Sequence, residues 1–240
     1  MVPESLTDEQ FKENENIVVY SGGCDSTLVL YKVCERAKKL GKGVYVLCID
    51  SEECATSAEH YMEERARDIF IEYMRKRGVE IRKFQFNASL NVPHDYVYES
   101  DNGGNPQATI WLSAITYLSG YTLRGWNVYM GYVSGDCTIR SISDINNAFY
   151  YITEVNLGNS IRIVLPLQFR AKTWILEELH KHNIYNFTWY CENPHDGIIR
   201  NWEKSFKPCN ECHSCRTHIM ALKEIDKTWT HLELRKLGVK

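Results

Sequence analysis

A short glycine-containing segment near the start of the chain has the residues that a phosphate-binding turn needs. It reads Ser21-Gly22-Gly23-Cys24-Asp25-Ser26-Thr27 and follows the apolar run 17–20. Two glycines let the backbone turn tightly and approach a ligand closely. Ser26 and Thr27 can cap a helix that starts here, and the amides and dipole of such a helix start can hold a phosphate-sized anion. We therefore expect an anion site at this turn; an ordinary strand-to-helix turn is the alternative.

Four of the nine cysteines lie together in the last quarter of the sequence. They are Cys191, Cys209, Cys212 and Cys215, and the last three form two overlapping CxxC spacings. Four thiolates around Zn2+ make a closed tetrahedral site without an open position for water. We therefore predict a structural zinc ion that stabilises the surrounding loop. His195 and His213 are substitute ligands, and an iron–sulfur cluster or free thiols are the alternatives.

The composition is that of a globular protein. The 240 residues are 44% hydrophobic, and no apolar run approaches the ~18 residues of a membrane span. The net charge of -3 gives no general attraction for polyanions, so nucleic acid is not the expected partner. The acidic start of the chain differs from a secretory signal, and we expect a cytoplasmic protein. The scattered cysteines are then expected to be small buried side chains: Cys24, Cys34, Cys48, Cys54 and Cys137.

Short apolar runs alternate with longer amphipathic or charged stretches along the chain. The runs predict strands at 17–20, 44–49, 79–86, 128–132 and 161–165. The stretches predict helices at 26–40, 56–77, 106–123, 142–157 and 172–181. This alternation predicts an α/β fold in which helices cover both faces of a parallel sheet. We expect one domain over residues 14–240, with a zinc-binding subregion at about 186–222.

The order of strands and polar residues places the candidate chemistry at one edge of the sheet. Ser21 follows the first predicted strand, Asp50 follows the second, and the stretch 133–137 follows the fourth. Open parallel sheets bind ligands beyond the carboxyl ends of their strands. We therefore expect these three segments to contribute to a single site.

The glycine-containing segment resembles the SGGxDS signature of the PP-loop ATP pyrophosphatases, with Cys24 at the variable position, where a packing role is expected. Further segments are similar to the QueC family, the 7-cyano-7-deazaguanine synthases of queuosine biosynthesis. Residues 131–137 are similar to that family's GxNxxDYSGYPDCR segment. The other matching positions are 110–113, Pro166, Lys172, 188–191 and 208–216.

The resemblance implies a C–N ligase that uses ATP with Mg2+ and 7-carboxy-7-deazaguanine. The acid would be adenylated, ammonia would form an amide, and a second ATP would convert the amide into the nitrile. Lys172 would add a cation for the phosphates, a surface lysine being the alternative, and a homodimer is left open. The implied ATP contacts are Ser21, Gly22, Gly23, Asp25, Ser26 and Thr27, with Asp50 added from its place at the sheet edge. The candidate substrate contacts are Ser134, Asp136 and Arg140, although Asp136 is as readily a turn residue.

The resemblance is weaker around the expected substrate and acceptor. Gln107 and Ala108 stand where the family commonly has Arg-Asn, and residues 50–54 and 135–141 depart from the family's segments. One alternative is therefore the same adenylation with an amine of a partner protein as the acceptor, a conjugation that would suit antiviral defence.

Two further alternative functions share less with the QueC family. One is a non-catalytic zinc-containing module that binds nucleic acid, because Lys204, Lys207, Arg216 and His218 flank the grouped cysteines. The other is tRNA thiolation or a related amidation within the PP-loop superfamily.

Overall fold

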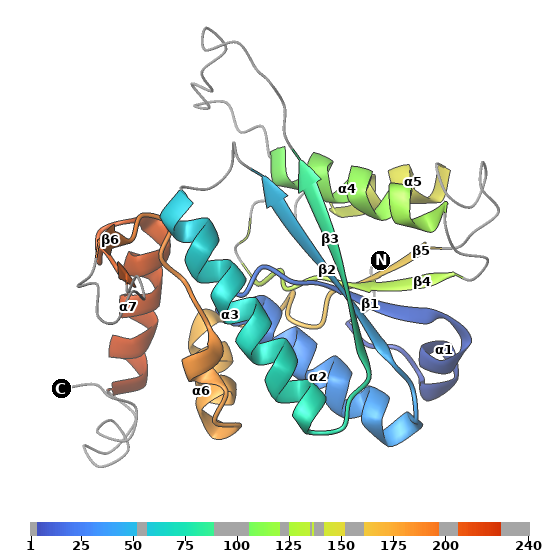
Figure 1. Ribbon diagram of the computed structural model, residues 1–240, viewed down its shortest axis with the longest axis horizontal. Coiled ribbons are helices and arrows are strands. Elements are labelled where there is room, and N and C mark those ends of the chain that lie inside the picture. Colours follow the sequence, from blue (N-terminus) through green and yellow to red (C-terminus); the bar gives the residue numbers. More distant parts are fainter. Residues whose placement is uncertain are drawn as a thin grey trace, which may run out of the picture.

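The computed structural model describes residues 4–51, 57–88, 106–120, 125–134, 136, 142–151, 161–196 and 206–226. Within these residues, five strands form a parallel sheet in the order β3-β2-β1-β4-β5 (Figure 1). They are β1 (Glu15–Val19), β2 (Val44–Ser51), β3 (Ile81–Ala88), β4 (Trp126–Tyr129) and β5 (Ile161–Val164). The predicted α/β fold class is confirmed, and each predicted strand is present within a few residues of its expected bounds.

Alternate side chains of the central strands enter two hydrophobic cores, one on each face of the sheet. In β2, Val46 and Cys48 belong to one core and Leu47 to the other, against which Tyr45 and Ile49 also pack. Because both faces are buried, a strand of this sheet is a nearly continuous apolar run rather than an alternation of polar and apolar residues.

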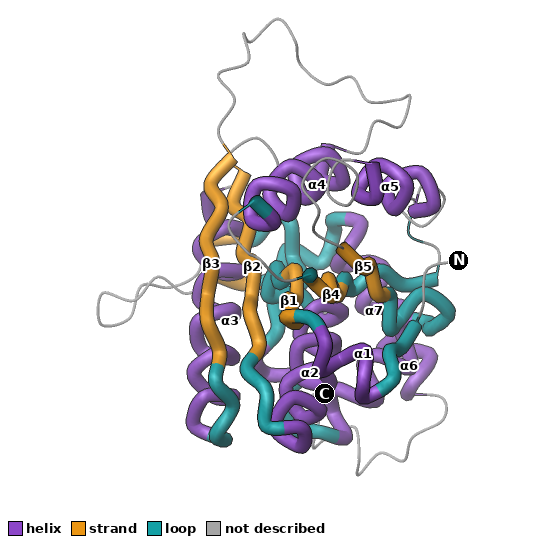
Figure 2. Tube along the Cα trace, turned by 90° about the vertical axis from the view of Figure 1, so that its right-hand side faces the viewer, coloured by secondary structure: helices purple, strands orange, loops and turns teal. Residues whose placement is uncertain are grey.

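Helices cover both faces of the sheet (Figure 2). α4 (Pro106–Ser119) and α5 (Ile142–Phe149) contribute to the core on one face. The core on the other face contains residues of α1 (Asp8–Glu13), α2 (Cys24–Leu40), α3 (Ser57–Lys76), α6 (Lys172–Lys181) and α7 (His213–Asp226). No helix in the described part of the chain is long and apolar enough to cross a membrane.

The structure adds two α-helices, a short 3-10 helix (η3, Tyr185–Phe187) and a small second sheet to the predicted elements. α1 has a capping box between Thr7 and Gln10, but its six residues are too few to show a helical period. α7 begins within the second CxxC spacing, so that Cys215 lies in its first turn, and it packs along α6. β6 (His195–Asp196) pairs antiparallel with β7 (Phe206–Lys207), which brings the segment after Cys191 beside the segment before Cys209.

Some predictions concern residues outside the described part of the chain. These residues are Arg140 among the substrate contacts, Cys54 and Cys137 among the scattered cysteines, and Lys204 near the grouped cysteines. Cys24, Cys34 and Cys48 are buried, as expected.

Candidate nucleotide site and cysteine cluster

The glycine-containing segment forms the turn from β1 to α2 (Figure 1). Gly22 has a φ of 92°, in the left-handed region that favours glycine. Gly23 is the N-cap residue of α2, which has no side-chain cap. The prediction that Ser26 and Thr27 cap this helix is therefore wrong, because the helix begins at Cys24 and both residues lie inside it.

Two serine hydroxyls organise the turn. Ser21 Oγ accepts a hydrogen bond from the Gly23 amide at 3.2 Å, and Ser26 Oγ accepts one from the Ser21 amide at 3.3 Å. The Thr27 hydroxyl faces the core instead and lies 3.3 Å from the hydroxyl of Tyr20. The first amides of an α-helix have no partners within the helix, so the start of α2 offers donors to an anion.

Two glycines let other backbone segments pack directly on this turn. A Cβ atom at Gly131, just after β4, would lie 2.8 Å from the amide nitrogen of Ser26. A Cβ atom at Gly22 would lie 2.8 Å from the carbonyl oxygen of Glu63 in α3. The segment after β4 and the turn after β1 therefore meet at one place, as the sheet-edge argument predicts.

Lys172 lies at the first position of α6 and points at the start of α2. Its Nζ donates to both carboxylate oxygens of Asp25, at 2.8 and 2.6 Å. Burial by itself would lower the pKa of Lys172, but the charges of Asp25 and Asp136 outweigh this effect and the pKa is raised. Lys172 is therefore a charged ammonium beside the turn, not a surface lysine.

The predicted substrate contacts differ in what they do. Asp136 Oδ2 accepts a hydrogen bond from the Val133 amide at 2.8 Å, and the Asp136 amide donates to the Val133 carbonyl at 3.1 Å. Asp136 is thus a turn-forming residue, and burial raises the pKa of its carboxyl group. Ser134 is exposed and its amide donates to the Arg170 carbonyl at 3.2 Å.

Asp50 belongs to a charged cluster beneath the turn that the sequence did not indicate. Its Oδ1 accepts from Arg67 Nη2 at 2.7 Å, and its Oδ2 accepts from Gln85. The side chain of Arg67 is only 1% exposed, and Arg67 Nη1 lies 4.0 Å from Glu63 Oε2. Burial, followed by the charge of Glu59, raises the pKa of Glu63 to about 8.

Asp50 and Arg67 are held in place by protein groups. Both carboxylate oxygens of Asp50 accept hydrogen bonds, one from Arg67 and one from Gln85. A Cβ atom at Gly22 would lie 3.1 Å from Arg67 Cγ, so the arginine packs directly under the turn. The spacing of Glu59, Glu63 and Arg67 by four residues was the available signal, because it places all three on one side of α3.

The four grouped cysteines converge in space. Their Sγ atoms all lie within 4.8 Å of one another, and the Sγ atoms of Cys209 and Cys215 are 3.9 Å apart. Asn210 has a φ of 64°, which produces the tight turn after Cys209. Main-chain amides donate to the sulfur atoms, among them the Cys209 amide to Cys191 Sγ and the Cys212 amide to Cys209 Sγ, both at 3.2 Å.

This arrangement can hold a zinc ion. Zn–S bonds of ~2.3 Å in a tetrahedron place the sulfur atoms ~3.8 Å apart, close to the 3.9 Å between Cys209 and Cys215, and all four sulfur atoms lie within 4.8 Å of one another. An iron–sulfur cluster spreads its ligands around several irons and needs a wider arrangement. None of the four cysteines is in a disulfide. Among the described residues, the group that could hold a metal consists of these cysteines alone, without His195 or His213.

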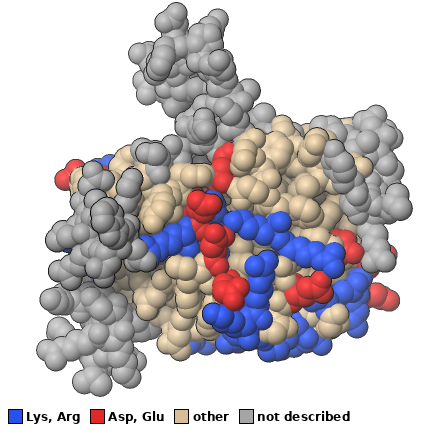
Figure 3. Space-filling view, in the orientation of Figure 1, with Lys and Arg blue, Asp and Glu red and all other residues tan. Residues whose placement is uncertain are grey.

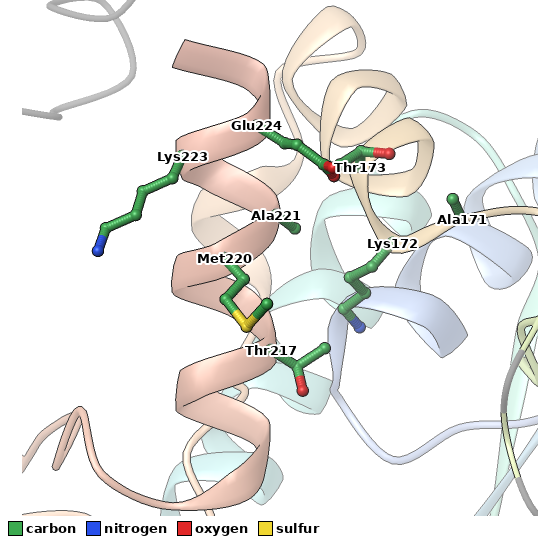
Figure 4. A pocket seen from close by; sticks show the side chains of 8 residues that line it. All are labelled: Ala171, Lys172, Thr173, Thr217, Met220, Ala221, Lys223 and Glu224. Atoms are coloured by element: carbon green, nitrogen blue, oxygen red, sulfur yellow. The ribbon is translucent and has the colours of Figure 1, made fainter. Parts of the chain in front are cut away.

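A groove lies between α7 and the start of α6, and Lys172, the partner of Asp25, is one of the residues that line it (Figure 4). Its volume is about 500 Å³, in the range of small-molecule sites. Lys172 lines it from α6, and Thr217 and Met220 line it from α7. Glu224 extends toward Thr173 across the groove.

The surface around α3 and β3 carries charges of both signs (Figure 3). Lys83 pairs with Asp68 at 2.7 Å, and Arg82 pairs with Glu80 at 2.8 Å. Near the cysteines, His218 is fully buried and stacks on Tyr190 at 3.8 Å, so it does not reach a ligand at the surface. These observations do not favour a nucleic-acid interface at the cysteine cluster.

Comparison with known proteins gives a family match and a structural similarity. Residues 124–226 match the family model described as "Queuosine biosynthesis protein QueC", so the resemblance to that family is confirmed over this segment. The fold is similar to that of the U34-tRNA thiolase NcsA from Methanococcus maripaludis, solved with its [4Fe-4S] cluster. That similarity has a TM-score of 0.49 at 12% identity and covers 90% of this chain and 67% of that one. No curated protein matches the chain.

Proposed function

We propose, from the QueC-family segment at residues 124–226, that this chain is an ATP-dependent C–N ligase that acts on 7-carboxy-7-deazaguanine. The acid would be adenylated with release of pyrophosphate, and ammonia would displace AMP to give an amide and then the nitrile. The observation that carries the proposal is the ion pair of Lys172 with Asp25 at the start of α2. It places a charged ammonium next to the amides that would hold a triphosphate.

The reaction needs adenylation because a carboxylate is a poor acyl donor. A carboxylate oxygen attacks the α-phosphorus of ATP, the bond to the β-phosphate oxygen breaks, and pyrophosphate leaves. Ammonia then attacks the acyl carbon and AMP leaves with the bonding electrons. A second ATP activates the amide oxygen in the same way, and loss of AMP and a proton leaves the nitrile. None of these reaction steps requires a nucleophile from the protein.

The residues of the turn would serve the departing pyrophosphate. Amides at the start of α2, with the helix dipole, would donate to its oxygen atoms, and Ser21 would add a hydroxyl donor, while the Ser26 hydroxyl donates to the Gly23 carbonyl at 3.3 Å. Lys172 would balance the charge that develops on the leaving group. Mg2+ bound with ATP supplies further charge neutralisation.

The groove beside Lys172 is the proposed place for the acid. It has the volume of a small-molecule site and opens next to the ion pair. Ser134 and Asp136 stay candidate contacts, with Asp136 acting through the turn that it forms. The cysteine cluster would hold Zn2+ in a closed site, which contributes stability and leaves no open position for chemistry.

A second candidate keeps the adenylation and changes the acceptor to an amine of a partner protein. What favours it is that the departures from the family pattern, at Gln107 and Ala108 and in 135–141, fall in segments that the resemblance assigns to the substrate and acceptor, while the turn and cysteines are retained. A nucleic-acid module has less support, because His218 is buried and only Lys207 and Arg216 of the described flanking residues are exposed.

Mass spectrometry of the products tests the proposal. Isotope-labelled 7-carboxy-7-deazaguanine is incubated with ATP and Mg2+, with and without ammonia, and pyrophosphate and AMP are measured in parallel. We expect AMP to depend on the acid, and the amide and nitrile to appear only with ammonia. AMP that forms without either product would favour the protein amine. No AMP with this acid, or undiminished AMP in the variant Asp25→Ala, would contradict the proposal.

A further inference from the structure

The segment 188–191 runs directly from the turn to the cysteine cluster. At the turn, the amide of Trp189 donates to the carbonyl oxygen of Gly22 at 3.0 Å. Beside it, Cys24 Sγ donates to Thr188 Oγ1 at 3.3 Å. The segment therefore holds the backbone of the turn by one main-chain hydrogen bond and the first residue of α2 by a side-chain contact.

The other end of the segment belongs to the cluster. Cys191 is one of its four cysteines, and its carbonyl oxygen accepts a hydrogen bond from Trp189 Nε1 at 2.8 Å. The ring of Tyr190 stacks on His218 of α7 at 3.8 Å and 5°. The three remaining cysteines lie at the start of α7 or just before it. A metal ion would thus join this segment to α7.

The hydrogen bond from Trp189 falls at the residue that shapes the turn. Gly22 has the left-handed φ, and the next residue, Gly23, caps α2. A shift of the Gly22 carbonyl rotates the peptide plane that also carries the Gly23 amide, because the two groups belong to the same planar unit. The position of Trp189 is therefore coupled to the direction of a donor in the turn.

We propose that residues 188–191 act as a tether through which the metal-bound cysteine cluster holds the turn in its nucleotide-binding conformation. The inference rests on the proposed ATP site and adds a role for the cluster beyond local stability. Trp189 is then a positioning residue that acts through its main-chain amide. Tyr190 of the tether packs against both the buried cysteines and the core on the α2 face of the sheet, so the experiments measure the fold separately from ATP binding.

The first test removes the metal. The purified full chain, loaded with Zn2+, is compared with protein stripped by a chelator, and the Kd for ATP is measured by calorimetry in the absence of the acid. Circular dichroism reports the sheet and helices, and hydrogen exchange reports residues 21–27 and 15–19 separately. We expect the Kd to rise at least tenfold and exchange to quicken in 21–27 but not in β1. Unchanged ATP affinity in stripped, folded protein would overturn the proposal.

The second test cuts the tether in protein that keeps its metal. Trp189→Pro removes the amide that donates to Gly22, whereas the matched variant Trp189→Ala removes the same side chain and keeps the amide. Thr188 is already extended, with φ -106° and ψ 151°, as a residue before proline requires. We expect Trp189→Pro to bind ATP at least fivefold more weakly than Trp189→Ala, at equal zinc content and equal unfolding temperature.

The outcomes separate this inference from the proposed function. Equal ATP affinity of the two Trp189 variants would overturn the tether, whatever the stripped protein does. If Trp189→Pro does not fold, Thr188→Val against Thr188→Ser makes the same comparison at the contact with Cys24. If the wild-type chain loaded with Zn2+ binds ATP, the proposed ATP site is upheld. If it does not bind ATP, both the proposed ATP site and the tether are overturned.

Discussion

Lys172 binds both carboxylate oxygens of Asp25, a residue 147 positions earlier in the chain, at 2.8 and 2.6 Å. The pair joins the start of α6 to the start of α2. Without the lysine, the carboxylate would stand uncompensated where we propose that a triphosphate binds, and the two negative charges would repel each other. The ammonium balances Asp25 and, in the proposed function, would also face the phosphates.

Lys172→Met is expected to lower acid-dependent AMP formation by ~10²-fold, because it removes the cation that would stabilise the leaving pyrophosphate. Lys32→Met is the matched control, since Lys32 also pairs with a carboxylate, that of Glu178 at 3.0 Å, and its side chain is more exposed than that of Lys172. Pyrophosphate release at saturating ATP measures both variants. Equal losses in the two variants would mean that position 172 has no special part in the reaction.

Gly131→Ala is expected to weaken ATP binding by ~10-fold or more, because its Cβ would lie 2.8 Å from the Ser26 amide and displace one of the two backbones. Gly43→Ala is the control, since its Cβ would meet Glu80 at an ordinary contact distance of 3.5 Å. Calorimetric titration with ATP gives the two affinities. Wild-type affinity in Gly131→Ala would show that the turn tolerates a shift of this segment.

The turn and the cysteine cluster could be predicted because their chemistry is local in sequence. The glycine-containing segment 21–27 and the overlapping CxxC spacings at 209–215 each occupy seven residues, and the backbone within such a length decides where the groups point. The fold class also followed from local pattern, because a strand buried on both faces is a continuous apolar run. The helix was predicted to begin at Ser26, but α2 begins at Cys24. Ser26 and Thr27 are therefore helical residues and not cap residues.

Burial of charge could not be predicted from the same pattern. Residues 57–76 read as a long charged helix, and although the spacing places Arg67 on the same side as Glu59 and Glu63, it does not show that this side is buried. Its burial results from the packing of α3 under Gly22, a contact between segments about 40 positions apart. Likewise, the sequence left Asp136 between substrate contact and turn residue, and the hydrogen bond with Val133 depends on the local backbone.

Arg67→Leu is expected to destabilise the fold by ~3–5 kcal/mol, because it leaves the partly buried carboxylate of Asp50 without the cation that binds it at 2.7 Å. Arg82→Leu is the control, because Arg82 pairs with Glu80 at the surface, where such pairs contribute ~0–1 kcal/mol. Urea unfolding curves of the metal-loaded proteins provide the comparison. A difference from wild type no larger for Arg67→Leu than for Arg82→Leu would exclude a structural role for the buried cation.

The raised pKa of Glu63 predicts a pH dependence of stability. Its value of about 8 in the folded chain lies above the ~4.3 of an unfolded glutamate, so between these values the folded state holds a proton that the unfolded state has lost. The contribution of Glu63 to the free energy of unfolding is therefore fully present at low pH, and it falls as the pH rises toward 8. Glu63→Gln carries no such proton, so its urea midpoint is expected to decline less between pH 5 and 8 than that of wild type. Glu64→Gln, on the exposed side of α3, is expected to follow wild type, and parallel curves for all three proteins would contradict the prediction.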